Sequence, residues 1–273
     1  MLRIRGSSRV LAVLGDPIAH SLSPEMHNAA IAGLGLDAVF IPLRVARATL
    51  PVALDGCAAL GIAGNITVPL KRAAAAHIAN LTPLAAALGA VNTFWVAAGA
   101  LHGDNTDVAG LDEALAMLDA EPPWLVVGAG GSARAVASVA ARRGVPLLVS
   151  ARTAERAATF CAWARSLEGD PDVRPDDAQP VGTVINASPL GLAPGDPDPL
   201  PAERWRSAAA ALDLVYRPGE TAWVRACRAA GLRAADGRGL LVAQGAHAFE
   251  RFFPGVRAPR ELMRAAVARA LAT

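Results

Sequence analysis

The stretch WLVVGAGGSARAVASVAARRG, residues 124–144, decides the fold of this chain. A short apolar run leads directly into a glycine-rich turn and then into an alanine-rich segment, which is the order strand, loop, helix. In this G-x-G-x-x-A turn, Gly128 allows the tight bend, Gly130 lets the backbone approach a pyrophosphate, and Ala133 permits close helix–strand packing. The free N–H groups at the helix start bind the anion. We therefore predict a Rossmann-type dinucleotide site at Gly128, Ala129, Gly130, Gly131, Ser132 and Ala133. A glycine-rich turn of a flavodoxin-like fold is the alternative.

The next strand, in PLLVSART (146–153), ends without an acidic residue. Sites for NAD usually place Asp or Glu near this point to bind the ribose hydroxyls, whereas Arg152, Thr153 and Arg156 stand here. Positive charge suits the additional 2′-phosphate of NADP. We predict that these residues bind NADP. The alternative is a pair of solvated arginines in an arginine-rich chain.

Composition indicates a soluble globular protein and argues against several other classes. Its 273 residues suffice for two domains, and 53% of them are hydrophobic. A net charge of +2 with scattered arginines does not indicate a nucleic-acid partner. The three cysteines are far apart, which argues against a disulfide framework or a zinc site and fits a reducing cytoplasm. No apolar run is long enough for a signal-peptide core or a membrane span.

Short apolar strands alternate with alanine-rich helices along the whole chain, which predicts the α/β class with parallel sheets covered by helices on both faces. We expect a strand at 10–15, a helix at 23–35, a hairpin near 91–107 and a domain boundary within 108–122. The segments 170–180 and 193–201 are polar and rich in proline, so we expect them to be loops without chemistry.

GDPIAHSLSPEMHN (15–28) carries two serines directly before a predicted helix. We expect an extended segment here, so that the i, i+2 spacing of Ser21 and Ser23 directs both hydroxyls to one side. Two hydroxyls beside a helix start can bind a carboxylate. Ser23 is also expected to be the N-cap of the helix, a role compatible with the first.

GNITVPLK (64–71) contains the only lysine of the chain, Lys71. We expect Thr67 at the tip of a strand, Pro69 as the helix starter and Lys71 in the first helical turn. The helix dipole disfavours a cation there. A lysine can give up its proton in catalysis and an arginine cannot, which is a reason to keep lysine at this position.

Further polar residues stand where predicted strands meet turns or helices. Asn92 in GAVNT either contacts a ligand or steadies a bend, and Asp107 in GDNTD is either functional or a helix cap. Tyr216, the only tyrosine, follows the strand ALDLV, and its alternative is a rim aromatic that packs a loop. We interpret His20 and His27 as polar packing residues, because their spacing and surroundings do not suit a metal.

These motifs together resemble those of the shikimate dehydrogenases, over nearly the full length of the chain. The resemblance is carried by GDPIAHSLSPEMHN, NITVPLK, GAVNT, GDNTD, GAGGSARA, ART followed by Arg156, INAS and DGRGLLVAQGAHAF. It implies a substrate-binding domain of residues 1–107 completed by helices in 241–273. It also implies a Rossmann NADP-binding domain of residues 108–240 and an active site in the cleft between them.

The resemblance also implies the reaction and the residues that perform it. The reaction is reversible NADPH-dependent reduction of 3-dehydroshikimate to shikimate, in chorismate and aromatic amino-acid biosynthesis, without a metal. Lys71 and Asp107 match the catalytic pair, and Ser21 and Ser23 match serines that bind the substrate carboxylate. Further substrate contacts are implied for Thr67, Asn92, Tyr216 and Gln244. NADP contacts are implied for residues 128–133, Arg152, Thr153, Arg156, Leu214 and Gly237.

Three positions depart from the family pattern, and several alternatives stay open. Ala151 replaces a usual Asn, Ser188-Pro189 stands where Thr-Ser is common, and Arg238 adds a charge near the cofactor.

A quinate/shikimate dehydrogenase or an enzyme acting on an aminated ring is an alternative. So are a methylenetetrahydrofolate dehydrogenase and a non-catalytic NADP-binding module. The protein is expected to be a monomer or a homodimer with small-molecule ligands only.

Overall fold

The computed structural model describes residues 4–193 and 195–272, and the chain divides into two compact units. The first unit comprises Met1–Gly110 and Leu241–Thr273, and the second comprises Leu111–Leu240. The outermost residues of the expected first domain, 1–3 and 273, lie outside the described residues. Each unit contains a six-stranded sheet, which confirms the predicted α/β class with two mostly parallel sheets.

The sheet of the first unit has the order β2-β1-β3-β5-β6-β4. Its strands are β1 (Arg9–Gly15), β2 (Ala38–Arg44), β3 (Ala63–Ile66), β4 (Asn80–Leu81), β5 (Thr93–Ala97) and β6 (Ala100–Asp104). Only β5 runs antiparallel to its neighbours, because β5 and β6 form the predicted hairpin. The helices are α1 (Ser23–Gly33), α2 (Leu50–Leu60), α3 (Lys71–His77), α4 (Pro83–Leu88), α5 (Asp107–Met117), α9 (Arg238–Phe252) and α10 (Arg260–Ala270), of which α5 and α9 continue into the second unit.

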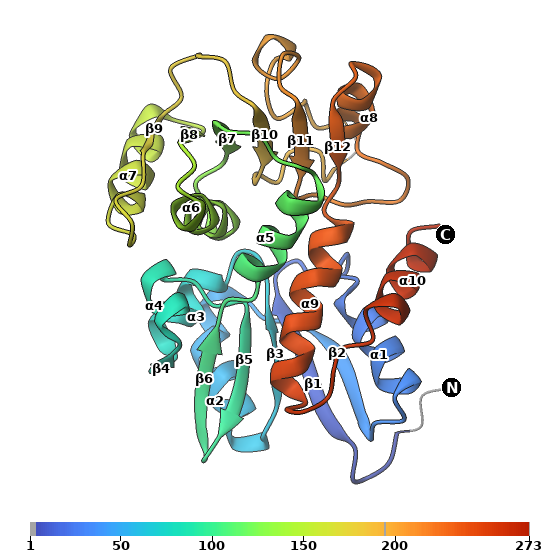
Figure 1. The fold of residues 1–273 in the computed structure, drawn as a ribbon. Coiled ribbons are helices and arrows are strands. Elements are labelled where there is room, and N and C mark those ends of the chain that lie inside the picture. Colours follow the sequence, from blue (N-terminus) through green and yellow to red (C-terminus); the bar gives the residue numbers. More distant parts are fainter. Residues whose placement is uncertain (1–3, 194, 273) are drawn as a thin grey trace. The chain divides into compact units, whose positions relative to one another are not determined.

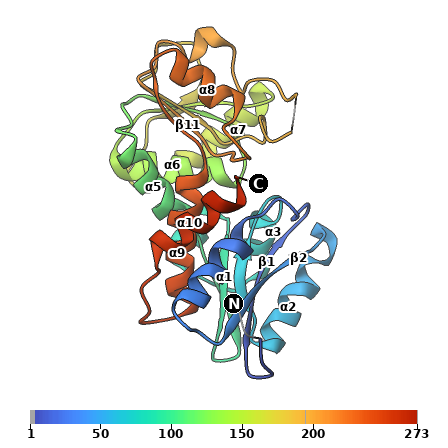
Figure 2. The ribbon, with the colours of Figure 1, turned by 90° about the vertical axis from the view of Figure 1, so that its right-hand side faces the viewer.

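Helices cover both faces of this sheet (Figures 1 and 2). Successive side chains of a strand point to opposite faces, so both faces can carry apolar residues that pack against helices. On one face, Ala12 and Leu14 of β1 share a buried cluster with Leu54 of α2. On the other face lie α1, α9 and α10, where the ring of His27 in α1 stacks on Phe40 at 4.4 Å. Apolar and aromatic side chains therefore pack against the sheet on both faces.

The sheet of the second unit is parallel throughout, with the order β12-β11-β10-β7-β8-β9. Read from β9, this is the 3-2-1-4-5-6 order of a doubly wound dinucleotide-binding sheet. Its strands are β7 (Trp124–Val127), β8 (Leu147–Ser150), β9 (Val173–Pro175), β10 (Thr183–Asn186), β11 (Ala210–Asp213) and β12 (Arg233–Ala235). The helices that lie wholly within it are α6 (Gly131–Arg143), α7 (Ala154–Ala164) and α8 (Ala222–Ala229).

The expectation of a loop at 170–180 is wrong in part, because β9 lies within it. Val173 is buried and pairs with Leu147 of β8. A strand of three residues between aspartates and prolines has too little periodicity to be recognised in the sequence. Among the described residues, no helix has both the length and the apolarity needed to cross a membrane.

Candidate functional site

Polar residues from distant parts of the first unit meet at one edge of its sheet. Asn65 of β3 pairs with Thr93 of β5, and Thr93 pairs with Asp104 of β6. The segment after β3, the residue before β5 and the segment after β6 therefore lie at the same edge. This register brings together the motifs NITVPLK, GAVNT and GDNTD.

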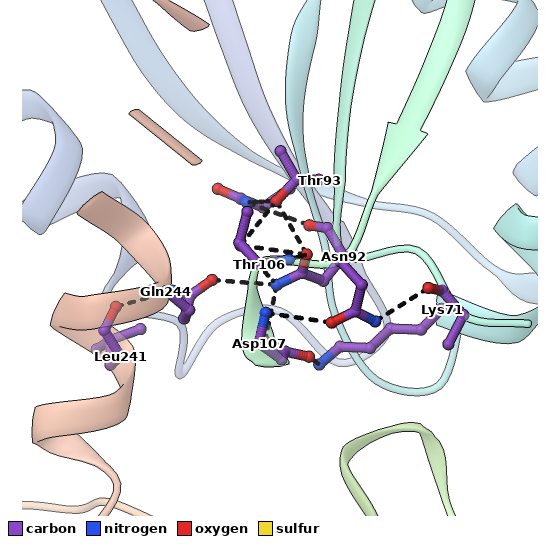
Figure 3. Close-up of polar contacts among 10 residues, drawn as sticks. Lys71, Asn92, Thr93, Thr106, Asp107, Leu241 and Gln244 are labelled. Carbon is purple, nitrogen blue, oxygen red and sulfur yellow. Dashed lines mark hydrogen bonds and ion pairs between the residues drawn. The ribbon is translucent and has the colours of Figure 1, made fainter. Parts of the chain in front are cut away.

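Lys71 and Asp107 form an ion pair at this edge, with 2.6 Å between Nζ and Oδ2 (Figure 3). Each side chain is only 12% exposed. Lys71 is the first residue of α3, which confirms its place in the first helical turn; the expected helix starter Pro69 instead precedes the N-cap, Leu70. Asp107 is the first residue of α5, and its carboxylate is directed to Lys71 rather than serving only as a cap. Partial burial strengthens the attraction between the two charges.

Asn92 joins this ion pair to helix α9. Its amide nitrogen donates to Asp107 Oδ1 at 2.7 Å and to Gln244 Oε1 at 3.3 Å. Gln244 is buried and donates to the carbonyl of Leu241, one turn earlier in α9. A Cβ on Gly110 would lie 2.6 Å from the backbone nitrogen of Gln244, so the glycine of α5 permits the close approach of α9. The structure thus connects Lys71, Asp107, Asn92 and Gln244.

Ser21 and Ser23 lie close together, although two expectations about them are wrong. The segment is not extended, because Leu22 between them has φ −92° and ψ 6°, and it is Leu22 that occupies the N-cap position of α1. Ser23 begins the helix, and its N–H donates to Ser21 Oγ at 3.4 Å. The serines are therefore neighbours through a turn at a helix start rather than through strand geometry.

Thr67 directly follows β3 and is anchored by its backbone, whose N–H donates to the carbonyl of Leu14 at 2.9 Å. A Cβ on Gly15 would lie 2.5 Å from the Thr67 methyl group. Glycine at the end of β1 therefore leaves room for the threonine side chain.

His27 is a packing residue, in agreement with the interpretation from sequence. Its ring is completely buried and stacks between Phe40 and Phe249, with ring centroids 4.4 Å and 6.2 Å away. Burial lowers the pKa of His27 to about 3. The described residues contain no group of three side chains able to hold a metal ion.

The glycine-rich loop of the second unit has the conformation that the motif requires. Gly128 has φ +118°, and a Cβ there would lie 2.9 Å from the carbonyl oxygen of Ala187. Gly130 is the N-cap of α6, and a Cβ there would meet nothing within 4 Å, so the backbone is open to a ligand. Ala133 is completely buried against the sheet. The first N–H groups of α6 receive no side-chain cap from Gly130, whereas the N–H of Gly128 donates to the carbonyl of Ser150 at 2.8 Å.

Arg152, Thr153 and Arg156 are exposed at the start of α7. Thr153 has a structural role that the sequence analysis did not foresee: it is the N-cap of α7, and its Oγ1 accepts from the N–H of Arg156 at 3.3 Å. This cap fixes the backbone between the two guanidinium groups. An exposed pair of cations at the end of the second strand of such a sheet suits a 2′-phosphate.

Leu214 and Gly237 meet through their backbones in the second unit. The N–H of Leu214 donates to the carbonyl of Asn186 at 2.9 Å, and a Cβ on Gly237 would collide with the carbonyl oxygen of Leu214. Tyr216 stands two residues beyond Leu214 in the same loop. Arg238, the charged departure in this region, is held by Asp236 through an ion pair of 2.6 Å.

Two threonines and an asparagine next to the predicted residues were missed by the sequence analysis. Thr93, Thr106 and Asn65 are buried and hydrogen-bonded around Asn92. The motifs GAVNT and GDNTD contain both threonines, but only the strand register reveals that their hydroxyl groups meet.

Comparisons with known proteins identify the family of this chain. Residues 13–94 match the model of the shikimate dehydrogenase substrate binding domain, and residues 237–268 match that of the shikimate 5'-dehydrogenase C-terminal domain. A shikimate dehydrogenase (NADP(+)) of Rubrobacter xylanophilus is 41% identical over 93% of both chains. A shikimate dehydrogenase (NADP(+)) of Thermosynechococcus vestitus is 36% identical over 100% of this chain and 99% of its own.

A solved structure is similar to this chain over nearly all of its length. It is the shikimate 5-dehydrogenase of Thermus thermophilus in complex with NADP(H) and shikimate, with a TM-score of 0.86 and 37% identity. The match covers 96% of this chain and 99% of that one. With relatives this similar over nearly all of its length, the chain belongs to the shikimate dehydrogenase family.

Proposed function

We propose that this chain is an NADP-dependent oxidoreductase that reversibly reduces 3-dehydroshikimate to shikimate, a step of chorismate and aromatic amino-acid biosynthesis. The observation that carries the proposal is the largely buried ion pair of Lys71 and Asp107, held by Asn92. Family membership and the names of the relatives support the same substrate and cofactor.

Lys71 is proposed to move the proton of the reaction. When a carbonyl carbon accepts hydride, its oxygen develops negative charge and must take up a proton. The ammonium group of Lys71 stabilises that charge and donates the proton, and in the reverse direction the amine accepts it. Asp107, at 2.6 Å, holds the lysine in position and accepts from a neighbouring substrate hydroxyl.

The remaining polar residues of the first unit are proposed to bind the ring. Ser21 and Ser23 bind the carboxylate, where the start of α1 adds a favourable dipole. Thr67, Asn92 and Gln244 bind the hydroxyl groups of the ring. Tyr216 is proposed as a further substrate contact from the second unit.

NADP is proposed to bind along the carboxyl edge of the second sheet, where it supplies or accepts the hydride. The loop of residues 128–133 holds its pyrophosphate, with the backbone N–H groups at the start of α6 as donors. The N–H of Gly128 is not one of them, because it donates to the carbonyl of Ser150. Arg152 and Arg156 bind the 2′-phosphate, with Thr153 fixing the loop. The backbones of Leu214 and Gly237 flank the nicotinamide.

The proposed place of action is the cytoplasm, because Cys57, Cys161 and Cys227 are all free, buried thiols, as is usual in a reducing compartment. Burial raises the pKa of Cys227 to about 12, which keeps that thiol protonated and unreactive.

Spectrophotometry tests the function directly. The purified protein is mixed with shikimate or quinate, and with NADP or NAD, and formation of the reduced nicotinamide is followed by absorbance. We expect fast reduction of NADP with shikimate and slow reactions in the other three mixtures. A preference for quinate would favour the quinate/shikimate alternative, and tight NADP binding without turnover would favour the non-catalytic alternative.

A further inference from the structure

Thr93 lies at the centre of a buried polar cluster beside the ion pair of Lys71 and Asp107 (Figure 3). It is the first residue of β5 and is completely buried. Its hydroxyl oxygen lies 3.0 Å from Asn92 Oδ1, 3.0 Å from Thr106 Oγ1 and 3.1 Å from Asn65 Nδ2. Three polar atoms therefore surround this hydroxyl group.

The hydroxyl hydrogen of Thr93 can be donated to only two acceptors. A threonine hydroxyl has one hydrogen to donate, and the amide nitrogen of Asn65 can only donate to it. Thr93 therefore donates either to Asn92 Oδ1 or to Thr106 Oγ1. In the second case Thr106 donates its own hydrogen to Asn92 Oδ1, 3.2 Å away. Both arrangements deliver a hydroxyl hydrogen to Asn92 Oδ1.

This hydrogen contributes to the orientation of the Asn92 amide. Asn92 Oδ1 also accepts from the backbone N–H of Thr106 at 2.8 Å, so the oxygen faces the threonines. The NH₂ group must then face Asp107 Oδ1, 2.7 Å away. The opposite orientation would place an amide oxygen against the carboxylate and leave buried donors without partners, which is unfavourable.

We propose that Thr93 is a positioning residue of the reaction, which acts by holding the Asn92 amide toward Asp107. The inference rests on the proposed function, because it takes Asn92 and Asp107 as parts of the active site. Asn65 supports Thr93, since its NH₂ group is divided between Thr93 Oγ1 and the carbonyl of Asn92.

The test replaces Thr93 by residues of similar shape. Thr93→Val removes the hydroxyl group at nearly constant volume, and kcat/KM for shikimate is expected to fall roughly 10- to 100-fold, as for other small misplacements of reacting groups. KM for NADP is expected to stay near its original value, because the glycine-rich loop belongs to the second unit. Thr183→Val is the matched control: Thr183 is a buried strand residue whose hydroxyl donates to the carbonyl of Glu121 at 2.8 Å, away from the site.

A second pair of variants keeps the test decisive if Thr93→Val fails to fold. Thr93→Ser retains the hydroxyl and should keep most of the activity. Thr93→Cys differs from the serine variant only in having sulfur in place of oxygen. Because a thiol is a weak hydrogen-bond partner, the cysteine variant should lose activity. Equal activity of the serine and cysteine variants, or full activity of Thr93→Val, would overturn the proposal. So would a loss in Thr183→Val as large as that in Thr93→Val.

A measurement without turnover separates this inference from the proposed function. Selective ¹⁵N-asparagine labelling gives side-chain amide signals from six residues, among them Asn92. We expect slow hydrogen exchange of the Asn92 amide in the original protein and fast exchange in Thr93→Val. Unchanged exchange would refute the role of Thr93. An original protein that does not oxidise shikimate would refute the function, while the exchange comparison would still decide whether Thr93 holds Asn92.

Discussion

Lys71 and Asp107 face each other from the first residues of two helices, α3 and α5. The positive end of a helix dipole stabilises the carboxylate of Asp107 and opposes the ammonium group of Lys71. Asp107 therefore gives the lysine the negative partner that its own helix does not provide. This relationship makes the chemical identity of the cation at position 71 the first thing to test.

Lys71→Arg is expected to keep the fold and the KM for shikimate but to lower kcat by roughly 100-fold or more, because arginine does not give up its proton. Steady-state kinetics and thermal melting measure both effects. The neighbouring exposed Arg72 gives a matched control, since Arg72→Lys exchanges the same two residue types and should leave kcat unchanged. A near-normal kcat in Lys71→Arg would refute proton transfer by Lys71.

Arg152→Ala is expected to raise KM for NADP by roughly tenfold and to leave KM for NAD unchanged, because a charge-assisted hydrogen bond contributes about 1.5–3 kcal/mol. Initial rates with both cofactors measure the preference. Arg165→Ala, at the other end of α7, is the control and should change neither constant. Equal KM values for NADP and NAD in the original protein would argue against binding of the 2′-phosphate by these arginines.

Asp213→Asn is expected to alter how stability depends on pH. Asp213 is completely buried and accepts from Asn186, Val215 and Thr221, yet burial raises its pKa to about 6. The folded state therefore binds the proton more tightly than the unfolded state. When the pH falls from about 7 to about 5, this group should therefore increase the free energy of unfolding by about 1 kcal/mol.

Denaturant titrations at the two pH values measure this gain, which should be absent in Asp213→Asn. Asp112→Asn is the control, because Asp112 is a partly exposed residue of the same unit that pairs with Arg143. A gain of the same size in the original protein and in Asp213→Asn would contradict the assignment.

His27→Leu is expected to change the pH dependence in the opposite sense. Burial lowers the pKa of His27 from 6.5 to about 3, so on acidification the unfolded state takes up a proton that the folded state does not. When the pH falls from about 7 to about 5, protonation of this group in the unfolded state should lower the free energy of unfolding of the original protein by about 2 kcal/mol. The leucine variant should lack that loss, whereas replacement of the exposed His20 by leucine should preserve it. If the free energy of unfolding changed with pH in the same way in the original protein and in His27→Leu, this explanation would be wrong.

The parts of the fold that depend on local chemistry could be predicted from the sequence. The turn at Gly128 and Gly130 needs particular backbone conformations that only a few residues allow, so its motif identifies the second sheet. The hairpin of β5 and β6 and the helical position of Lys71 follow in the same way from short-range patterns.

The features of the fold and of the candidate site that depend on tertiary structure could not be predicted from the sequence. Ser23 looks like an N-cap, but the conformation of Leu22 shifts the cap by one residue. The contact between Thr93 and Thr106 depends on the register of β5 and β6, which no single motif contains. Sequence patterns therefore pointed to the candidate residues, and only the structure shows how their hydrogen bonds are shared.

The first unit is assembled from two separate stretches of chain, and this affects its synthesis. Phe249 and Phe252 of α9 flank the buried ring of His27, but the ribosome makes them only after residues 111–240. At about 5–20 residues per second, the N-terminal stretch waits on the order of ten seconds before α9 and α10 are made. Until then α1 covers only part of this apolar face of the sheet. During that interval the nascent chain presents a surface on which chaperones can act, and the second unit has time to fold on its own.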